Sequence, residues 1–448
     1  MQELLKLVLP KVREADRRAQ AAARPGVFRD MGCGLLEKAL DPRGPSDKGL
    51  ARLIRKERRL GSKDRPVIVQ TLYGALRRRS LLECLLESSG VAVTPVSIWQ
   101  AELIVSRGLT PQDFGLPDDL QDISKCMSRW KDNSTPTNEV ELSVVCSLPL
   151  WMVRRLAQQE SAVDLPALCA SLSEEPLTTL RVNTSKTSSE ELQAVLSNEG
   201  VVVQAGRYAL EALRIEGRPN LLGSAAFKRG FFEVQDEASQ LIAELVEPVR
   251  SGMILDYCAG AGGKTLALAS RLPRGGRIVA TDIREQSLVE AERRLKRSGA
   301  KRVVTHCLKD SDLPLKKRSA ARVLVDAPCT GIGRMRRQPV RKWRMKEEEV
   351  QRQVSLQESI LQDASQWVMP GGRLVYATCS LLREENEEVV DQFLQKNPKW
   401  RQMSVREVLG RSRSKVFERG LFFRSYPHLH ETDGFAAAIL VAPRDDSQ

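Results

Sequence analysis

The stretch "LDYCAGAGGKTLALAS", Leu255 to Ser270, runs from an apolar segment through a glycine-rich turn into a helical pattern. Glycines between a strand and a helix let the backbone approach a ligand at the helix N-terminus, where unpaired N–H groups point outward. The next predicted strand ends about 20 residues later in an acid, Asp282, a position that suits ribose hydroxyl groups. The turn therefore predicts a site for a ligand that carries a nucleoside.

Two common templates fail at this turn, each by one residue. A phosphate-binding P-loop needs glycine five places before Gly263, where the chain has Cys258. The dinucleotide fingerprint fits Gly260 and Gly262 but needs a third glycine where the chain has Thr265. S-adenosylmethionine needs no triphosphate grip and is the obvious candidate, whereas a plain glycine-rich turn without a ligand is the alternative.

The bulk composition points to a multidomain protein that meets a polyanion. A chain of 448 residues predicts two or three domains. Lys and Arg outnumber Asp and Glu by 70 to 57, which gives a net charge of +13 and favours nucleic acid as the partner over a merely basic surface. The sequence has no signal-peptide core and no apolar run near the ~20 residues that cross a bilayer. We expect a cytoplasmic protein without membrane contact.

Cysteine and histidine usage argues against metal sites and disulfides. The nine cysteines are an odd number and form no CxxC pair, so reduced thiols fit better than a zinc ribbon or a disulfide framework. His428 and His430 are two of only three histidines, and a metal site would need more ligands. We expect a structural role for them and no metal ion.

Three regions of the chain differ in their patterns. Residues 1–135 read as helices with basic positions between apolar ones, which favours either RNA contact or solvated helix faces. Residues 143–225 predict a small α/β module, in which a helix begins at a capping box of Thr187 and Glu190. Residues 226–448 alternate short strands with helices, which is typical of a parallel, doubly wound sheet whose ligands lie at the carboxyl ends of the strands.

Two further strand ends of that sheet carry thiols. "VDAPC" places Asp326 and Cys329 at one strand end, and "YATCS" places Cys379 at a neighbouring one. A free cysteine is usually a small buried hydrophobe, which is the interpretation for four others: Cys33, Cys84, Cys169 and Cys307. Two thiols at one ligand edge instead indicate a nucleophile and a helper.

A thiol nucleophile suits methylation of a pyrimidine at carbon 5. That carbon is too weakly nucleophilic to take a methyl group directly, but a thiolate that adds at carbon 6 makes it enamine-like. A base then removes the carbon-5 proton, and the thiol is eliminated; a nearby acid can hold the ring edge during addition. Methyl transfer to an amino nitrogen needs no covalent step, so paired cysteines argue against it.

A basic segment, "GRMRRQPVRKW", follows the "DAPC" motif directly. Arginine and lysine contact RNA phosphates, and an aromatic ring among them can stack on a base. The segment thus predicts RNA contact, with a solvated charge run as the alternative, and its candidate residues are Arg334, Arg336, Arg337, Arg341, Lys342 and Trp343.

Taken together, these motifs resemble a known family. "DYCAGAGGKT", "ATDIR", "KDSDLPL", "DAPCTGIGRMRRQPVRKW", "GGRLVYATCSLLREEN" and "PHLHETDGF" follow one another as in the RsmB/Sun (Nop2-like) RNA cytosine-C5 methyltransferases. "RVNTSK" and "FFEVQDEASQL" resemble that family's linker module, and "GSKDRPVIVQTLYGALRRRSLLECLL" resembles the NusB-like domain of its 16S rRNA enzyme. The resemblance implies an all-α NusB-like RNA-binding domain, a small α+β (ferredoxin-like) module and a Rossmann-like class I methyltransferase domain dependent on S-adenosylmethionine.

The resemblance also implies a role for individual residues. Cys379 would be the nucleophile, Cys329 would help to release the product, Asp326 would lie between cofactor and cytosine, and Lys264 would reach the same pocket. The implied cofactor-binding residues are Cys258, Ala259, Gly260, Ala261, Gly262, Gly263, Lys264, Asp282, Asp310 and Asp326, with Asp312 as an alternative to Asp310 near the adenine.

One departure from the family stands in the glycine turn. The family has an alanine–proline step where this chain has Gly260 and Ala261. The turn loses the rigidity of proline but keeps Gly262, Gly263 and Lys264, so we expect cofactor binding to survive.

The leading hypothesis is a monomeric methyltransferase that acts on a cytosine of 16S ribosomal RNA. The alternatives are a non-catalytic RNA-binding assembly factor, a 5-methylcytosine enzyme for tRNA, and a DNA enzyme with the same covalent chemistry. An NTP-driven enzyme is a further alternative, which Cys258 in place of the P-loop glycine disfavours.

Overall fold

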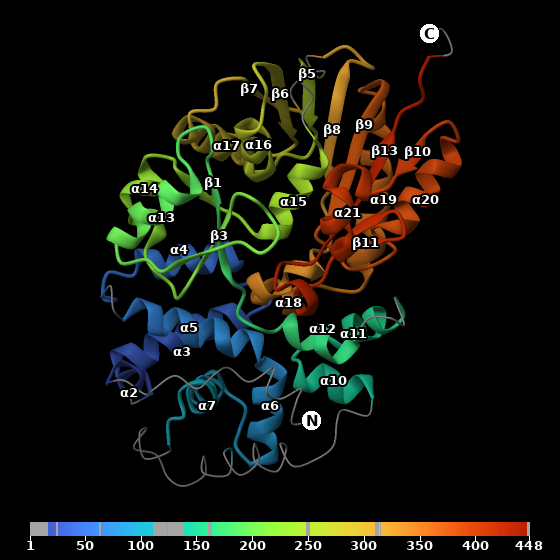
Figure 1. Cartoon of the computed structure of the whole chain (residues 1–448). Coiled ribbons are helices and arrows are strands. Elements are labelled where there is room, and N and C mark those ends of the chain that lie inside the picture. Colours follow the sequence, from blue (N-terminus) through green and yellow to red (C-terminus); the bar gives the residue numbers. More distant parts are fainter. Residues whose placement is uncertain are drawn as a thin grey trace. The chain divides into compact units, whose positions relative to one another are not determined.

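The structure is a computed structural model of the chain (Figure 1), and it describes residues 17–23, 26–61, 64–110, 123, 138–159, 164–247, 251–309, 313 and 315–445. The chain divides into two compact units. The first unit runs to Glu175 and also contains Arg334–Glu347, and the second contains Pro176–Gly333 and Glu348 onward. The chain therefore leaves the second unit within the basic segment and returns to it afterwards.

Helices build the described part of the first unit. They are α2 (Arg17–Ala23), α3 (Val27–Leu40), α4 (Asp47–Lys56), α5 (Arg65–Arg77), α6 (Arg79–Ser88), α7 (Pro95–Arg107), α10 (Glu139–Val145), α11 (Leu150–Ala157), α12 (Leu165–Ser171) and α18 (Pro339–Arg344). Trp99 of α7 is fully buried, and its Nε1–H donates to the carbonyl of Ala22 at 2.9 Å. Gly32 of α3 faces that indole so closely that a Cβ there would lie 2.4 Å from the ring. The helical pattern predicted for this region is confirmed, and its likeness to NusB stays a prediction.

The second unit begins with a four-stranded antiparallel sheet of order β2-β3-β1-β4. Its strands are β1 (Thr178–Val182), β2 (Val203–Ala205), β3 (Ala212–Ile215) and β4 (Phe232–Val234). Helix α13 (Ser189–Asn198) buries Leu192 and Leu196 against this sheet, together with Phe232 of β4. Strand β4 therefore completes this sheet, although its residues lie in the region predicted as the start of the catalytic domain, because Phe232 is a core residue here.

The capping box of α13 lies one residue later than predicted. Ser188 has an extended backbone and its Oγ accepts the N–H of Glu191, whose carboxylate accepts the N–H of Ser188 in return. The Thr187 hydroxyl donates to the same carboxylate at 2.9 Å. Two hydroxyl residues in succession made the register ambiguous in the sequence.

The large sheet of the second unit confirms the predicted parallel core. Strands β5 (Ser251–Asp256), β6 (Gly275–Asp282), β7 (Val303–Cys307), β8 (Ala320–Asp326) and β9 (Val368–Thr378) pair in parallel in the order β9-β8-β5-β6-β7. Antiparallel strands extend it beyond β9, namely β13 (Phe435–Val441), β12 (Phe422–Ser425) and β11 (Glu418–Arg419), and β10 (Arg401–Met403) pairs with β13. The three strands β10 to β12 were not predicted, because each has only two to four residues.

Helices connect these strands in opposite directions along the sheet (Figure 1). After β5 the chain moves outward through α16 (Gly263–Ser270) to β6 and through α17 (Glu285–Ser298) to β7, whereas α19 (Glu348–Ser365) leads from β8 to β9. The helices that follow in the chain order are α20 (Glu387–Lys396), α21 (Arg406–Phe417) and α22 (Pro427–His430), and α15 (Glu237–Leu245) precedes β5 and packs on α16. The switch in direction lies between β5 and β8, where a doubly wound sheet binds ligands.

In the part of the chain that the structure describes, no helix has both the length and the apolar character needed to span a bilayer.

Candidate active site

The loop between β5 and α16 needs its glycines. Gly260 and Gly262 have φ angles of +55° and +75°, in the left-handed region that side chains with a Cβ rarely adopt. A Cβ on Gly262 would also lie 3.0 Å from Cβ of Ala291 on α17. The N–H of Gly262 donates to the carbonyl of Ala259, so the loop turns tightly before α16 begins at Gly263. The predicted cofactor residues from Cys258 to Lys264 thus form a continuous stretch at the carboxyl end of β5, namely the loop and the first two residues of α16.

Asp282 ends β6 beside this loop, as its position in the sequence predicted. Its Oδ2 accepts the N–H of Gly260 at 2.9 Å, and its Oδ1 accepts the N–H of Arg284 at 2.8 Å. The residue is only 5% exposed, and the exposed guanidinium of Arg284 also donates to it, through Nε to Oδ1 at 3.2 Å and through Nη2 to Oδ2 at 3.4 Å. Ribose hydroxyls would take the place of these two side-chain hydrogen bonds. The two adenine candidates, Asp310 and Asp312, lie outside the described residues.

Asp256 and Thr265 lie beneath the loop. Asp256 at the end of β5 is 1% exposed, and its Oδ2 accepts the Thr265 hydroxyl at 2.6 Å. Burial raises the pKa of this carboxyl to about 7, although the hydrogen bond from Thr265 opposes the shift. Thr265, the residue that broke the dinucleotide template, therefore anchors α16 to β5.

Lys264 connects the loop to the end of β8. Its Nζ lies 2.6 Å from Oδ2 of Asp326 and 4.9 Å from the ring centroid of Phe435. The lysine is 8% exposed. An ammonium paired with a carboxylate and placed over an aromatic ring is held in one position, so Lys264 and Asp326 lie together at the edge where the sheet switches direction.

The two predicted active-site thiols also meet at this edge. Sγ of Cys329 and Sγ of Cys379 are 3.4 Å apart, after the ends of β8 and β9. The hydrogen bond with Cys379, followed by burial, raises the pKa of the Cys329 thiol well above its usual range. Cys329 therefore keeps its proton beside Cys379 and can offer it in a hydrogen bond. Gly331 lies close to Cys379, since a Cβ on it would be in ordinary contact with Sγ at 3.6 Å, and its φ of +74° favours glycine.

A buried carboxylate that was not predicted holds the thiol loop. Glu385 is fully buried, and its carboxylate accepts the N–H and the hydroxyl of Thr330, next to Cys329. It also accepts the amide of Gln357 at 3.0 Å, and its own carbonyl accepts the hydroxyl of Tyr376 at 2.7 Å. A fully paired carboxylate inside a protein rigidifies its surroundings. The acidic run "REENEE" after "ATCS" was the signal, but it does not reveal which acid turns inward.

The neighbouring Asn386 fixes the loop that carries Cys379. Its Oδ1 accepts the hydroxyl of Thr378 at 2.7 Å, and its Nδ2 donates to the carbonyl of Ser380 at 3.2 Å. The carbonyl of Cys379 accepts the N–H of Gly333 at 3.0 Å. These hydrogen bonds fix the end of β9, the backbone of Cys379 and the turn that follows it.

The candidate residues of the basic segment lie in different environments. Lys342 is fully buried in the first unit, where its Nζ donates to the carbonyl of Arg77 at 2.8 Å, and burial lowers its pKa well below the usual range. Arg336 is 3% exposed. The indole of Trp343 donates to the carbonyl of Leu76 at 2.7 Å. The six candidates therefore do not form one solvent-facing strip, because α18 packs into the helical unit.

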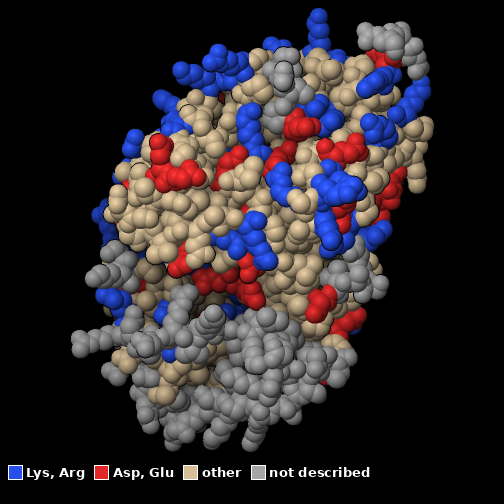
Figure 2. Space-filling view, viewed as in Figure 1, with Lys and Arg blue, Asp and Glu red and all other residues tan. Residues whose placement is uncertain are grey.

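Arg341, by contrast, is exposed, and Arg334 and Arg337 are half-buried. The N–H groups of Val340 and Arg341 donate to the carboxylate of Asp47, both at 3.1 Å, and so fix the start of α18. On the face drawn in Figure 2, Lys and Arg are spread over the described surface with acidic side chains among them. The positive charge on that face is thus distributed rather than confined to one track.

The remaining candidates take no part in this edge. His430 is 2% exposed, its Nδ1 accepts the N–H of Tyr426 at 2.8 Å, and its ring stacks on Phe417. Burial lowers its pKa. Among the described residues no group of His, Cys, Asp and Glu has the arrangement of a metal site, and the described cysteines are free thiols.

Comparison with known families places this edge in context. Residues 243–441 match the family described as 16S rRNA methyltransferase RsmB/F. Residues 148–221 match the ferredoxin-like domain described as Methyltr_RsmF/B-like. The two matches cover the four-stranded sheet except β4, and nearly the whole of the large sheet.

Individual relatives agree with the family matches. The probable ribosomal RNA small subunit methyltransferase B of Synechocystis sp. is 27% identical over 427 residues, which are 88% of this chain and 95% of that protein. The probable enzyme of the same name from Bacillus subtilis is 30% identical over 296 residues, 66% of each chain. A crystal structure of NSun6 from Pyrococcus horikoshii with SFG has a TM-score of 0.57 and 23% identity, covers 66% of this chain and 99% of that one, and shows the shared fold.

Proposed function

Since this chain carries the methyltransferase domain of the RsmB/F family and that family's ferredoxin-like domain, we propose that it methylates carbon 5 of a cytosine in 16S ribosomal RNA, with S-adenosylmethionine as the donor. The observation that carries the proposal is the pair of thiols 3.4 Å apart at the switch point of the sheet. Methyl transfer to nitrogen or oxygen needs no thiol, whereas attack on carbon 6 of a pyrimidine needs one.

The loop after β5 fits S-adenosylmethionine chemically. The left-handed glycines keep side chains away from the ligand space, and Asp282 offers carboxylate oxygens to ribose hydroxyls. Residues 258–264 would line the site, and the bound donor supplies an electrophilic methyl group on a sulfonium. A triphosphate does not fit the pattern, because Cys258 stands where a P-loop has glycine.

Cys379 is the proposed nucleophile. Its thiolate adds to carbon 6 of the cytosine, and the electron pair of the 5,6 double bond becomes available at carbon 5. Carbon 5 takes the methyl group, a base removes the carbon-5 proton, and the pair of electrons left behind re-forms the double bond and expels the Cys379 thiolate. The thiol of Cys329, which keeps its proton, is placed to donate a hydrogen bond to the departing Cys379 thiolate and so assist the release.

Asp326 and Lys264 support the addition step. A carboxylate at the end of β8 can accept hydrogen bonds from the amino group and the protonated ring nitrogen of a cytosine, and that nitrogen becomes more basic when carbon 6 is attacked. Lys264 fixes the orientation of Asp326 through the 2.6 Å ion pair. The target base must be unstacked or already single-stranded before it reaches this edge.

The test separates the two thiols. Purified Cys379→Ala protein should bind S-adenosylmethionine but form no 5-methylcytosine in 16S ribosomal RNA, measured by transfer of labelled methyl groups. Cys329→Ala protein should accumulate a covalent RNA adduct that resists denaturing electrophoresis. Cys307→Ala is the matched control, because Cys307 is also a half-buried free thiol at the end of a strand of the same sheet. Normal methylation by the Cys379→Ala protein would refute the proposal, and absence of donor binding by the wild type would favour a non-catalytic RNA-binding role.

A further inference from the structure

An arginine on α17 holds the glycine loop by its backbone. Nη1 of Arg294 donates to the carbonyl of Ala261 at 2.7 Å. The other side of the same guanidinium, through Nε and Nη2, binds Oε2 of Glu233 at 3.2 and 3.1 Å. The side chains of Arg294 and Glu233 are 17% and 6% exposed, so water competes little for either. The guanidinium is thus fixed by Glu233 with one donor aimed at the loop.

The carbonyl that Arg294 binds belongs to a peptide bond whose next residue is the flexible Gly262. The peptide between Ala261 and Gly262 has its N–H bound to the carbonyl of Ala259 and its C=O bound to Arg294. Gly262 has φ of +75°, and glycine populates several backbone conformations at little cost. With both polar groups bound, the peptide has one orientation. Without Arg294, only the N–H is held.

Helix α17 also packs on this loop through a second residue. Ala291 lies one turn before Arg294 on the same helix face. A Cβ added to Gly262 would lie 3.0 Å from the Cβ of Ala291. The distance between α17 and the loop is therefore set by close packing, and Arg294 adds the directional bond.

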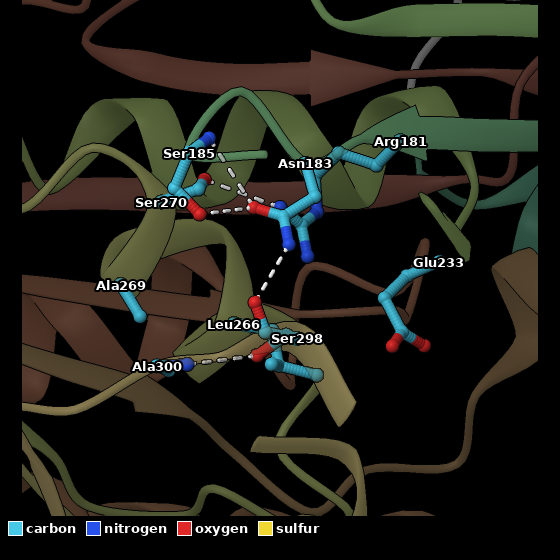
Figure 3. Close-up of a pocket in the computed structure, with 9 residues that line it drawn as sticks. All are labelled: Arg181, Asn183, Ser185, Glu233, Leu266, Ala269, Ser270, Ser298 and Ala300. Atoms are coloured by element: carbon cyan, nitrogen blue, oxygen red, sulfur yellow. Dashed lines mark hydrogen bonds between the residues drawn. The ribbon is translucent and has the colours of Figure 1, made fainter. Parts of the chain in front are cut away.

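Glu233 brings the four-stranded sheet into this arrangement. It lies on β4, which pairs with β1, and its other oxygen binds Arg297. Glu233, Arg181 and Ser298 are among the residues that line a cavity of about 20 Å³, room for about one water molecule (Figure 3). Asn183, which also lines this cavity, donates to the carbonyl of Ser298, the last residue of α17, at 2.9 Å. The ferredoxin-like sheet and the residue after its strand β1 thus bind the C-terminal part of α17, the helix that carries Arg294.

From these contacts we propose that Arg294 is a positioning residue for the methyl donor, and that Glu233 of the small sheet fixes the orientation of the Arg294 guanidinium. The carboxylate orients the guanidinium, the guanidinium orients the Ala261 carbonyl, and the fixed peptide shapes the floor of the donor site. This inference rests on the proposed function of the loop in binding S-adenosylmethionine. It assigns to the ferredoxin-like sheet an effect on donor affinity in addition to any effect on RNA.

The chain offers a matched pair of variants. Arg294→Met and Arg297→Met each remove one arginine of α17 that binds Glu233, but only Arg294 reaches the loop. Loss of one charge-assisted hydrogen bond corresponds to about a tenfold change in affinity. We therefore expect the dissociation constant of S-adenosylmethionine, measured by calorimetry, to rise about tenfold in Arg294→Met and less than about twofold in Arg297→Met. Equal effects in the two variants would make Arg294 a mere part of the docking of α17 and overturn the inference.

Two further variants keep the test decisive if Arg294→Met does not fold. Glu233→Gln leaves Arg294 in place but removes the charge that orients it, and Arg294→Lys keeps a cation without the planar fork. Both should weaken donor binding by a few-fold while RNA affinity, measured by filter binding, stays unchanged. Wild-type donor affinity in both variants would overturn the inference alone. Failure of the wild-type protein to bind the donor would instead overturn the proposed function.

Discussion

The glycine loop and the basic segment were both identified from local sequence patterns, but the pattern specifies the local structure of the loop far more fully than that of the basic segment. The loop, residues 258–264, depends on backbone conformation, and its left-handed glycines at 260 and 262 specify the turn by themselves. The basic segment, residues 333–343, depends on where charged side chains point. Lys342 of α18 and Arg336, which precedes that helix, are both buried. A backbone motif thus carries its own structural instruction, whereas a charge pattern depends on what packs against it.

The largest expected effect concerns the lysine at the end of the loop. Lys264→Met should lower kcat on the order of 10³-fold, within the range expected for loss of a positioned acid–base or charge partner, because Asp326 loses its counter-ion. Donor affinity should change much less than kcat. Steady-state methyl transfer at saturating substrates measures kcat, and calorimetry measures the affinity. An equal loss in Lys296→Met, a lysine on α17 with no such partner, would contradict the assignment.

The second effect lies beneath the loop and depends on pH. The pKa of Asp256 is about 7 in the folded chain, against an ordinary value of 3.8, because the carboxyl is buried. Because the pKa is higher in the folded chain than in the unfolded chain, the folded state binds the proton more tightly. The stability that this proton contributes is complete below pH 3.8 and is lost as the pH rises through about 7. Asp256→Asn should remove this pH dependence. Above pH 7 the free energy of unfolding of the variant should exceed that of the wild type by on the order of a few kcal/mol. Urea unfolding at pH 5 and pH 8 measures it, and parallel pH curves for the two proteins would contradict it.

The third effect tests the backbone instruction itself. Gly262→Ala places a Cβ on a left-handed residue and 3.0 Å from Ala291. The left-handed conformation costs roughly 1–2 kcal/mol for a residue with a Cβ, and the contact adds to that cost. We expect thermal unfolding at a lower temperature and weaker donor binding. Gly410→Ala is the control, since its φ is also +75° but no atom lies within 4 Å of the added Cβ. Equal losses of donor affinity would show that the loop is not special.

The smallest effect tests the other side of the comparison. Exposed Arg341 and buried Lys342 are adjacent in the sequence. Arg341→Gln should weaken RNA binding a few-fold and reduce the slope of log affinity against log salt by roughly 0.7–0.9, as expected for one lost phosphate contact. Lys342→Gln should leave that slope unchanged and alter the stability of the helical unit instead. Equal changes in slope would mean that Lys342 is released when RNA binds.

Particular residues show how far the sequence could reach. Apolar runs between turn residues are a local signal that predicts strands. In residues 226–448 these runs correspond to β5 to β9 and β13, and they lie at 253–259, 277–283, 302–308, 321–328, 372–380 and 434–443. Asp282, Asp326, Cys329 and Cys379 follow from strand ends alone. Glu385 was missed because four acids stand within "REENEE", and only packing selects the one that turns inward.

The sequence by itself determined the order of strands and helices, the left-handed turn after β5 and the presence of two thiols at one sheet edge. These features are local, since they depend on glycine, on hydrophobic periodicity and on the alternation of elements along the chain. Tertiary structure alone decided that Lys342 is buried and that β4 completes the small sheet. It also decided that Arg294 binds both Glu233 and the carbonyl of Ala261 in the glycine loop. Those contacts join residues far apart in the chain, and no periodicity encodes which charged side chain meets which partner.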